Sequence, residues 1–567
     1  MLTRGKTKRN LKAGLLWLLP LAFLAFFFYQ PLVAIFRLVF SPQFASGWDR
    51  FDLTQLTRPL LFSLYQAGLS TLLTLALGLP AAWLFARIDF PGRKFLRTLA
   101  LLPFILPTVV VAAAFNALIG PRGWLNLGLM QLLGLAQPPI HLVGGLGAII
   151  LAHVFYNTSI VIRMVGTAWG HLNPRLEEAS RMLGASPWET LRRVTLPLLG
   201  PSILGAALLV FLFDFTSYGV VRMLGRPGLG TLEVDIYTQA MYYLNLPVAG
   251  LLSIVQLIFT LLLTIMQNRV TSPRYGKAAL ASESRVLHPP RGLGQKLLAG
   301  FLILIILLMV VMPLGSLVTR SLVTLDAERG QRGGIERGFT LRYYQELFVN
   351  RTGSLFYVPP LLAVRNSLLY AFLATLIAAA LGLLAAYALA GSSGAWGLLE
   401  PLFMLPLGTS AVTLGLGFLV VFNRPPWNDP RLPLLIPIAH ALIGLPFVVR
   451  SLLPAIRSLP ANLRETARVM GASPWRVFME VDLPILLRAL LVAMVFAFTI
   501  SLGEFGAASF LASPQNPTIP VAIFRYISQP GALNYGQALA MSTLLLLVCA
   551  AGSFLIEKIR LPGEESF

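Results

Sequence analysis

RMLGASPWETLRRVTLP, residues 181–197, returns nearly unchanged as RVMGASPWRVFMEVDLP, residues 468–484. Both copies are charged and amphipathic, yet the chain of 567 residues is 56% apolar and only 12% charged. Soluble globular proteins carry roughly 25% charged residues. The composition therefore indicates a membrane protein in which each half carries one copy of the same polar segment.

Apolar runs long enough to cross a bilayer occur twelve times. A helix of about 20 apolar residues spans a hydrocarbon core of about 30 Å and satisfies its own backbone there. The expected spans are residues 13-39, 61-86, 98-120, 143-168, 198-218, 246-267, 297-320, 364-390, 397-422, 434-456, 486-511 and 536-556. The apolar run after the basic N-terminus is too long for a signal peptide, so we expect it to remain as the first span. The fold class expected is an all-α polytopic membrane protein.

The formal charge of +21 is sorted by side of the membrane. With the N-terminus in the cytoplasm, the cytoplasmic segments hold about 25 Lys and Arg and the opposite segments about 14. This positive-inside bias predicts a multi-pass protein with both termini in the cytoplasm, embedded in lipid. A nucleic-acid-binding face would be contiguous and interleaved with aromatic residues, so no nucleic acid partner is expected. The single cysteine, Cys549, excludes a disulfide framework.

The repeat extends through both halves of the chain. At the same displacement as the opening stretch, His153 corresponds to His440, Arg163 to Arg450 and Gly219 to Gly506. Each half has six spans, an even number, so the two repeats cross the membrane in the same direction. Parallel repeats are related by a pseudo-two-fold axis along the membrane normal, with a pathway at their interface. The expected domains are a first half (1-267), a basic cytoplasmic linker (268-296) and a second half (297-567).

The repeated stretch is typical of two short capped helices. Pro174 opens the first helix and Gly184 stops it. Ser186 and Glu189 form a capping box for the second helix, and Pro197 is expected to mark its join to the next span. The second copy has arginine in place of the capping-box glutamate.

Each copy is expected to expose one tryptophan, Trp188 or Trp475, within a small apolar patch. An amphipathic helix lying among lipid headgroups is the alternative. Such a helix needs only one apolar face, whatever residues form it, whereas both halves here have the same residues GASPW. Two equivalent patches about one pseudo-dyad fit a partner that is itself a symmetric pair.

With their flanks, EEASRMLGASPWETLRRVTLP and RETARVMGASPWRVFMEVDLP resemble the EAA loop of type I binding-protein-dependent ABC importer permeases. The resemblance covers almost the whole chain and implies the type I importer fold, with EAA loops at 174-197 and 461-484. In that family the loop is the coupling helix that docks in a groove of the ATPase subunit. The residues implied to do so here are Glu178, Ala179, Gly184, Trp188, Leu191 and Pro197, and in the second half Glu465, Ala467, Gly471, Trp475, Phe478 and Pro484.

The chain has no GxxxxGK[ST] phosphate-binding loop, so we do not expect it to be an enzyme or to hydrolyse ATP. The resemblance implies that ATP and Mg²⁺ are used by a partner, an ATP-binding cassette subunit present in two copies. It also implies an extracytoplasmic solute-binding protein and a location in the bacterial inner membrane. No catalytic residue, bound cofactor or metal site is expected in this chain.

Two acidic residues within the spans are candidate pathway residues. A charge at the centre of a membrane helix costs about 2.5 to 3.5 kcal/mol, and Asp214 and Glu504 both lie in predicted spans. At about 1.5 Å per residue, they lie roughly 25 to 30 Å from the cytoplasmic join, near the outer face. With Ser217 and Ser501 they are predicted to line an outer gate. The alternative is that they are interfacial side chains that reach water.

Two pairs of residues at matching positions have structural interpretations. His153 and His440 are expected to form hydrogen bonds rather than to bind metal, because no converging ligands are visible in the sequence. Pro107 and Pro406 are expected to kink their spans.

A permease whose halves are fused in one chain resembles the thiamine and ferric-iron importers. The segments AHVFYN (152-157), GPRGW (120-124) and SLGEFG (501-506) are more similar to the thiamine permeases. Thiamine is therefore the expected solute and ferric iron the alternative, although no residue gives a chemical reason for either. An ion-coupled secondary transporter is the alternative from another class, but it would place its acids near the midplane.

Overall fold

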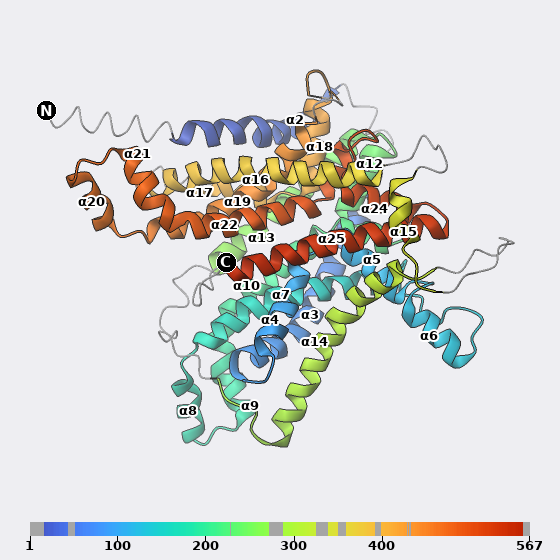
Figure 1. The fold of residues 1–567 in the computed structure, drawn as a ribbon, viewed down its shortest axis with the longest axis horizontal. Coiled ribbons are helices and arrows are strands. Elements are labelled where there is room, and N and C mark those ends of the chain that lie inside the picture. The colour runs from blue at the N-terminus through green and yellow to red at the C-terminus, as the bar shows by residue number, and fades with distance from the viewer. Residues whose placement is uncertain are drawn as a thin grey trace.

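The computed structural model describes residues 16–42, 51–226, 228–270, 287–324, 338–349, 359–391, 399–427, 429 and 433–559. These residues are almost entirely helical, and the β-structure among them is limited to three isolated bridges. The long helices run roughly side by side along the longest axis of the molecule (Figure 1).

The helices of the first half are built from residues 16–270. In chain order they are η1 (Ala25–Tyr29), α2 (Gln30–Val39), α3 (Thr54–Arg87), α4 (Arg93–Leu101), η3 (Leu102–Ile105), α5 (Thr108–Ile119), α6 (Trp124–Leu133), α7 (Leu146–His171), α8 (Pro174–Met182), α9 (Pro187–Thr190), η4 (Leu191–Thr195), α10 (Leu196–Phe215), α11 (Gly219–Leu224), α12 (Leu232–Met241) and α13 (Leu246–Val270).

The second half follows a similar order from residue 292 onward, without a counterpart of α6 among its described residues and with α15 and η6 added after its first helix. Its helices are α14 (Gly292–Ser321), α15 (Arg342–Gln345), η6 (Glu346–Phe348), α16 (Pro360–Ala390), α17 (Glu400–Met404), η8 (Leu405–Gly408), α18 (Ala411–Phe422), α19 (Leu435–Arg457), α20 (Ala461–Val469), α21 (Pro474–Val477), η9 (Phe478–Asp482), α22 (Leu483–Gly503), α23 (Gly506–Leu511), α24 (Ile519–Ser528) and α25 (Ala532–Ile559).

Eleven of the described helices are long and apolar enough to cross a membrane, and one bent pair raises the count to twelve. The eleven are Leu16–Val39, Thr54–Arg87, Thr108–Leu133, Leu146–His171, Pro187–Phe215, Leu246–Val270, Gly292–Ser321, Pro360–Ala390, Leu435–Arg457, Pro474–Gly503 and Ala532–Leu555. The bent pair joins Glu400–Gly408 to Ala411–Phe422 at 98°. The chain is a multi-pass membrane protein, and the predicted all-α fold is confirmed.

Two of the predicted spans are broken. The span at 98-120 is divided at Leu106, whose backbone is extended, and α5 begins only after Pro107. Proline disfavours the helical conformation of the residue before it, which explains the break. The span at 397-422 has its 98° bend just beyond Pro406, where the Ser410 side chain accepts the N–H groups of Val412 and Thr413 and so caps α18. These prolines therefore accompany sharp breaks, which go beyond the expected kinks.

As predicted, Pro197 lies at a join, where the π-turn Leu191–Thr195 meets α10, but the join is not a break. A continuous helix runs from Pro187 to Phe215. A π-turn in which Leu196 bonds back to the Leu191 carbonyl precedes the proline, and the second half has the same turn at Phe478–Asp482. Pro197 follows the π-turn directly, and its missing N–H removes one helix hydrogen bond without ending the helix. The second short helix of the repeated segment is thus continuous with a membrane helix.

Close helix packing in each half depends on one glycine. A Cβ atom added at Gly78 of α3 would lie 2.6 Å from Val161 of α7. At Gly382 of α16 it would lie 2.5 Å from Val448 of α19. Small residues let membrane helices approach closely where no hydrophobic driving force assists. The two halves therefore contain the same tightly packed helix pair.

The first helix of each half packs on the other half. Trp17, Leu24 and Phe28 are buried in a core formed by α16, α18 and α19. Conversely, α14 buries Leu302 and Ile306 against α3 and α4. The two halves are therefore interlocked and do not merely lie side by side.

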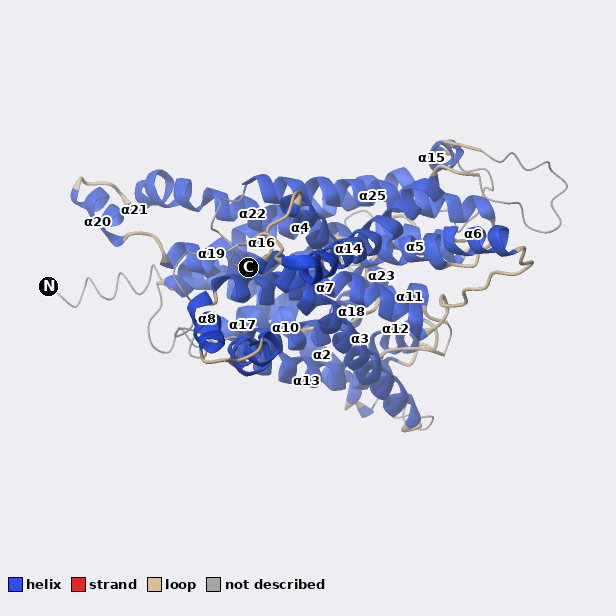
Figure 2. Ribbon diagram, turned by 90° about the horizontal axis from the view of Figure 1, so that it is seen from below, coloured by secondary structure: helices blue, strands red, loops and turns tan. Residues whose placement is uncertain are grey.

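The repeated segments lie at the same end of the molecule. The helices α8 and α20 project at the left of Figure 1, and α6 and α15 lie at the opposite end, as they also do in Figure 2. This is the arrangement that parallel repeats require. The predicted linker at 268-296 lies mostly outside the described residues, and α13 and α14 extend into it from both sides. The domain boundaries stay a prediction.

Candidate functional site

Each half projects a pair of short helices that we call its elbow, residues 174–190 and 461–477. In the first elbow, Ser186 and Glu189 form the predicted capping box: the Ser186 N–H donates to Glu189 Oε2 (2.9 Å) and the Glu189 N–H to Ser186 Oγ (3.2 Å). The glycines between the short helices, Gly184 and Gly471, have φ of +88° and +83°. A side chain at this left-handed position is strained, so the sharp angle of each elbow depends on glycine.

Each elbow exposes large apolar side chains. Trp188 and Trp475 are 65% and 67% exposed, and the neighbouring Leu183 and Met470 are 89% and 82% exposed. These pairs occupy corresponding positions in the repeat. Exposed apolar patches of this kind mark interaction surfaces.

The predicted coupling residues lie on the elbows and on the first turns of the helices that continue them. Glu178, Ala179, Gly184, Trp188, Pro197, Glu465, Gly471, Trp475 and Pro484 are exposed or partly exposed, and Leu191, Ala467 and Phe478 are half-buried. Their role in coupling stays a prediction.

A polar anchor at the base of each elbow was missed from the sequence. In the first half, Glu177 accepts hydrogen bonds from Thr195 Oγ1 (2.9 Å) and from Arg87 Nη2 (3.2 Å). In the second half, Arg464 Nε donates to Asp482 Oδ1 at 2.8 Å. Positions 177 and 195 correspond to 464 and 482 in the repeat. The same two positions therefore form a glutamate–threonine hydrogen bond in the first half and an arginine–aspartate ion pair in the second.

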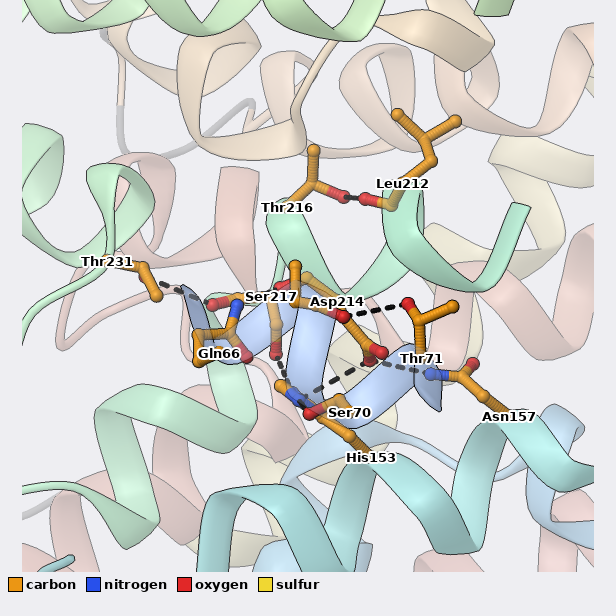
Figure 3. A network of polar contacts seen from close by, with 11 residues as sticks. Gln66, Ser70, Thr71, His153, Asn157, Leu212, Asp214, Thr216, Ser217 and Thr231 are labelled. Atoms are coloured by element: carbon orange, nitrogen blue, oxygen red, sulfur yellow. Dashed lines mark hydrogen bonds and ion pairs between the residues drawn. The ribbon is translucent and has the colours of Figure 1, made fainter. Parts of the chain in front are cut away.

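At the other end of the membrane helices, the first half contains a buried cluster around His153 (Figure 3). Its Nδ1 lies 3.4 Å from Asp214 Oδ1 and 3.2 Å from Ser70 Oγ, and its Nε2 lies 2.8 Å from Ser217 Oγ. Asn157 Nδ2 donates to Asp214 Oδ1 at 2.6 Å. Residues from α3, α7 and the end of α10 are thereby held together.

The second half contains the corresponding cluster around His440. Its Nδ1 lies 2.7 Å from Ser501 Oγ, and its Nε2 lies 3.4 Å from Glu504 Oε2. The Glu504 carboxylate also accepts the N–H groups of Ala507 and Ala508 (3.2 and 3.1 Å), and so caps α23. This cluster therefore joins α19 to the break between α22 and α23.

The acid and the serine occupy swapped positions in the two clusters. Position 214 corresponds to 501 and position 217 to 504, so the sequence has Asp-x-x-Ser in one half and Ser-x-x-Glu in the other. The four residues predicted to form an outer gate thus form two histidine-centred clusters. Their lining of a pathway stays a prediction.

The alternative that these acids reach water is wrong for this structure, because Asp214 and Glu504 are only 1% and 9% exposed. The physical reason is that the histidines and amides of neighbouring segments compensate the acids inside the protein. The predicted hydrogen-bonding role of His153 and His440 is confirmed.

Aromatic residues close the interface between the halves just beyond these clusters. Tyr218 and Phe505, which occupy corresponding positions, have ring centroids 5.1 Å apart. Behind each ring lies its partner in the same half, Tyr237 at 5.5 Å from Tyr218 and Phe524 at 5.4 Å from Phe505. Because equivalent residues meet only on a symmetry axis, the pseudo-dyad passes between Tyr218 and Phe505. We call these four residues the dyad aromatics.

The helices that hold the outer rings are fixed in the same way in both halves. Ser63 Oγ accepts the N–H of Leu232 at the start of α12 (2.9 Å). Ser367 Oγ accepts the N–H of Ile519 at the start of α24 (2.8 Å). Tyr237 and Phe524 are therefore positioned by α12 and α24.

One buried carboxyl group connects the halves. Glu233 of α12 is 1% exposed and accepts hydrogen bonds from Ser410 Oγ of the second half (2.7 Å) and from Gln256 Nε2. Burial raises the pKa of Glu233 to about 8, so its neutral form predominates at neutral pH. The corresponding residue of the second half is Pro520, so this link has no symmetric mate.

The chain matches a known family twice. The model of the inner membrane component of binding-protein-dependent transport systems matches residues 75–274 and again residues 378–559. The chain belongs to this family. It is a permease with two halves fused in one chain, and membership favours the importer permease over the ion-coupled carrier considered above.

Relatives of this permease match it over most of its length. The thiamine transport system permease protein ThiP of Salmonella typhimurium is 26% identical over 524 residues, with 89% of each chain covered. The protein of the same name from Brucella abortus is 26% identical over 533 residues, with 92% of this chain and 91% of the relative covered. A crystal structure of a bacterial ABC transporter involved in the import of alginate covers 48% of this chain and 100% of its own, at 19% identity and a TM-score of 0.40.

Several of these features carry a signal in the repeat that position-by-position comparison reveals. The displacement of 287 residues between the two EAA loops pairs Tyr218 with Phe505. It also pairs Asp214 with Ser501 and Ser217 with Glu504. The Glu233–Ser410 contact has no such signal, because it joins residues at non-equivalent positions of the two halves.

Proposed function

We propose that this permease imports thiamine. The observation that carries the proposal is the match to thiamine transport permeases over about nine-tenths of both chains. Thiamine combines a flat pyrimidine with a thiazolium cation, and the interface between the halves is lined at its outer end by aromatic rings. Ring faces attract organic cations.

ATP hydrolysis by the partner subunits would act on the permease through the elbows. A pair of ATP-binding cassette subunits would use ATP and Mg²⁺ and dock on the exposed patches around Trp188 and Trp475. Since each elbow continues without a break into a membrane helix, drawing the elbows together would rotate α10 and α22. The far ends of these helices carry Asp214 and Glu504.

The outer end would then open. Rotation of α10 and α22 would separate Tyr218 from Phe505 on the dyad and admit thiamine from an extracytoplasmic solute-binding protein. In this arrangement the elbows and both termini face the cytoplasm of a bacterial cell, and the dyad aromatics close the opposite side.

The test is uptake of radiolabelled thiamine by proteoliposomes that contain the permease, its ATPase and its binding protein. We expect uptake that requires internal ATP and the binding protein together. A matched control carries Gly184→Trp and Gly471→Trp, which place a bulky side chain at the left-handed position of both elbows. ATP-dependent uptake of another solute with none of thiamine would contradict the proposal on substrate, and undiminished uptake by the control would contradict the proposal on coupling.

A further inference from the structure

A positively charged side chain lies among the rings at the outer end of the interface. The Arg222 guanidinium carbon is 5.3 Å from the Tyr242 ring centroid, 5.4 Å from that of Phe524 and 5.5 Å from that of Tyr237. Its Nη2 donates to the Tyr242 hydroxyl at 2.9 Å. We call these three rings the cage, and two of them, Tyr237 and Phe524, are dyad aromatics.

Arg222 has no carboxylate partner among the residues that the structure describes. Its Nε is buried and has no hydrogen-bond partner there. Arg222 is held by ring faces and one phenol hydroxyl. Another cation can make the same contacts with the rings and so can replace the guanidinium group. Arg222 therefore occupies a site whose chemistry suits an organic cation.

One side of the cage, Arg222 with Phe524, borders a cleft at this end of the molecule. A cleft of about 980 Å³ is bounded by the first turns of α3, by α11 and α12, and by α24 of the second half. Arg222 and Phe524 both line it. Phe524 in turn packs on Phe505 at the dyad. A solute in the cleft thus meets the cage before it meets the closed interface.

The charge of the cleft does not by itself attract a cation. Arg58 and Arg226 line it together with a single acid, Asp235, whose pKa burial raises to about 6. Attraction of a cation must therefore come from the rings. It must also involve displacement of Arg222, since its guanidinium group already occupies the ring faces.

The position is specific to one half. Tyr237 and Phe524 correspond in the repeat, but Arg222 corresponds to Ser509. The fold itself therefore does not require an arginine here, and the second half packs its equivalent helix with a serine.

We propose that Tyr237, Tyr242 and Phe524 form a binding site for a flat heteroaromatic cation, which Arg222 occupies while the interface is closed and yields to the solute when it opens. This inference rests on the proposed function for the identity of the cation. The resident arginine keeps the cage from retaining solute after release, because it competes for the same ring faces.

The test measures binding of labelled thiamine to the purified full-length permease by equilibrium dialysis, with no binding protein present. We expect Arg222→Ser to bind thiamine at least about 10-fold more tightly than the wild type, because the ring faces are freed. Arg222→Lys keeps a resident cation and should show no gain. Arg226→Ser removes the same charge from the cleft without touching the cage, so it should also show no gain.

Second-site variants test whether the cage rings bind the cation. In the Arg222→Ser background, Tyr237→Leu should abolish the gain, whereas Tyr237→Phe keeps a ring and should retain it. Thiochrome, an uncharged oxidation product of thiamine, should bind no more tightly to Arg222→Ser than to the wild type. Thermal unfolding of each variant checks that the chain remains folded.

The outcomes separate this inference from the proposed function. Thiamine uptake by the wild type with no gain of binding in Arg222→Ser overturns the cage and leaves thiamine import standing. A gain shared equally by Arg226→Ser or by thiochrome also overturns the cage. A specific gain of thiamine binding in Arg222→Ser, with no thiamine uptake by the wild type, supports the cage and overturns the proposed substrate.

Discussion

Single residues set the geometry at both ends of the permease. At the elbows, Gly184 and Gly471 adopt φ values of +88° and +83°, and a Cβ atom added at either position would meet no neighbouring atom within 4 Å. The need for glycine there is conformational and not steric. At the opposite end, Glu233 is buried against the second half, where the free-energy cost of burying a charge favours its protonated form.

We expect Gly184→Ala and Gly471→Ala each to weaken assembly with the ATPase. An L-residue in the left-handed region costs about 1 kcal/mol, which is roughly 5-fold in an equilibrium constant. Asparagine tolerates this conformation, so Gly184→Asn with Gly471→Asn is the matched control. Titration of labelled ATPase subunit onto the permease in nanodiscs measures the effect. Equal affinities for the alanine and asparagine variants would contradict the argument.

We expect Glu233 to make the permease less stable as the pH rises from about 5 to 8. Its pKa is about 8 in the fold against a usual 4.5, so the folded state holds a proton that the unfolded state loses in this window. Stability therefore falls between the two values and levels off above the higher one. Glu233→Gln does not titrate and should show a smaller fall, by at least about 1 kcal/mol. Thermal unfolding at pH 5, 6, 7 and 8 measures the difference, and parallel curves for both proteins would refute it.

At the scale of elements, the proposed coupling role requires that the base of each elbow be fixed. The π-turns keep the elbow continuous with α10 or α22, and the polar anchors tie α8 to η4 and α20 to η9. In the second half the anchor is a single ion pair, whose acid is largely buried. Removing one partner of such a pair leaves an uncompensated charge, which is costly.

We expect Arg464→Asp to reduce ATP-driven uptake about 10-fold, because two facing carboxylates would release α20 from η9. The exchanged variant, Arg464→Asp with Asp482→Arg, restores an ion pair of opposite polarity and should recover most of the uptake. Uptake and ATP hydrolysis are measured on the same proteoliposomes, since a loose elbow should lower solute moved per ATP. A single variant with normal uptake, or an exchanged variant no better than the single one, would argue against the anchor.

At the scale of the whole molecule, the interlocked first helices restrict how the halves can move. Because the first helix of each half packs on the opposite half, the halves cannot separate as independent bodies. A rocking motion about the dyad is compatible with this packing. It would open the outer end at Tyr218 and Phe505, which meet on that axis.

We expect a chemical bridge between these two positions to stop transport. Tyr218→Cys and Phe505→Cys, in a Cys549→Ser background, would be joined by a short bifunctional thiol reagent with a reducible link. Uptake should fall below about a tenth of normal and return on reduction, because release of the outer interface is part of each cycle. Trapping the ATPase with ATP and vanadate before adding the reagent should prevent the bridge from forming. Full uptake in the bridged protein would show that the dyad aromatics do not part.

The sequence by itself determined the membrane class, the two parallel halves and the capped elbows, because hydropathy, charge bias and capping are local properties that repeat at a fixed displacement. It also singled out Asp214 and Glu504, since charge within an apolar span is unusual, and with them Ser217 and Ser501. Only the tertiary structure decided that each acid is buried beside a histidine from another helix. The Glu233–Ser410 link and the ring cage around Arg222 likewise depend on how non-equivalent segments of the two halves meet. Periodicity cannot encode such contacts, because the packing of separate helices against one another selects them.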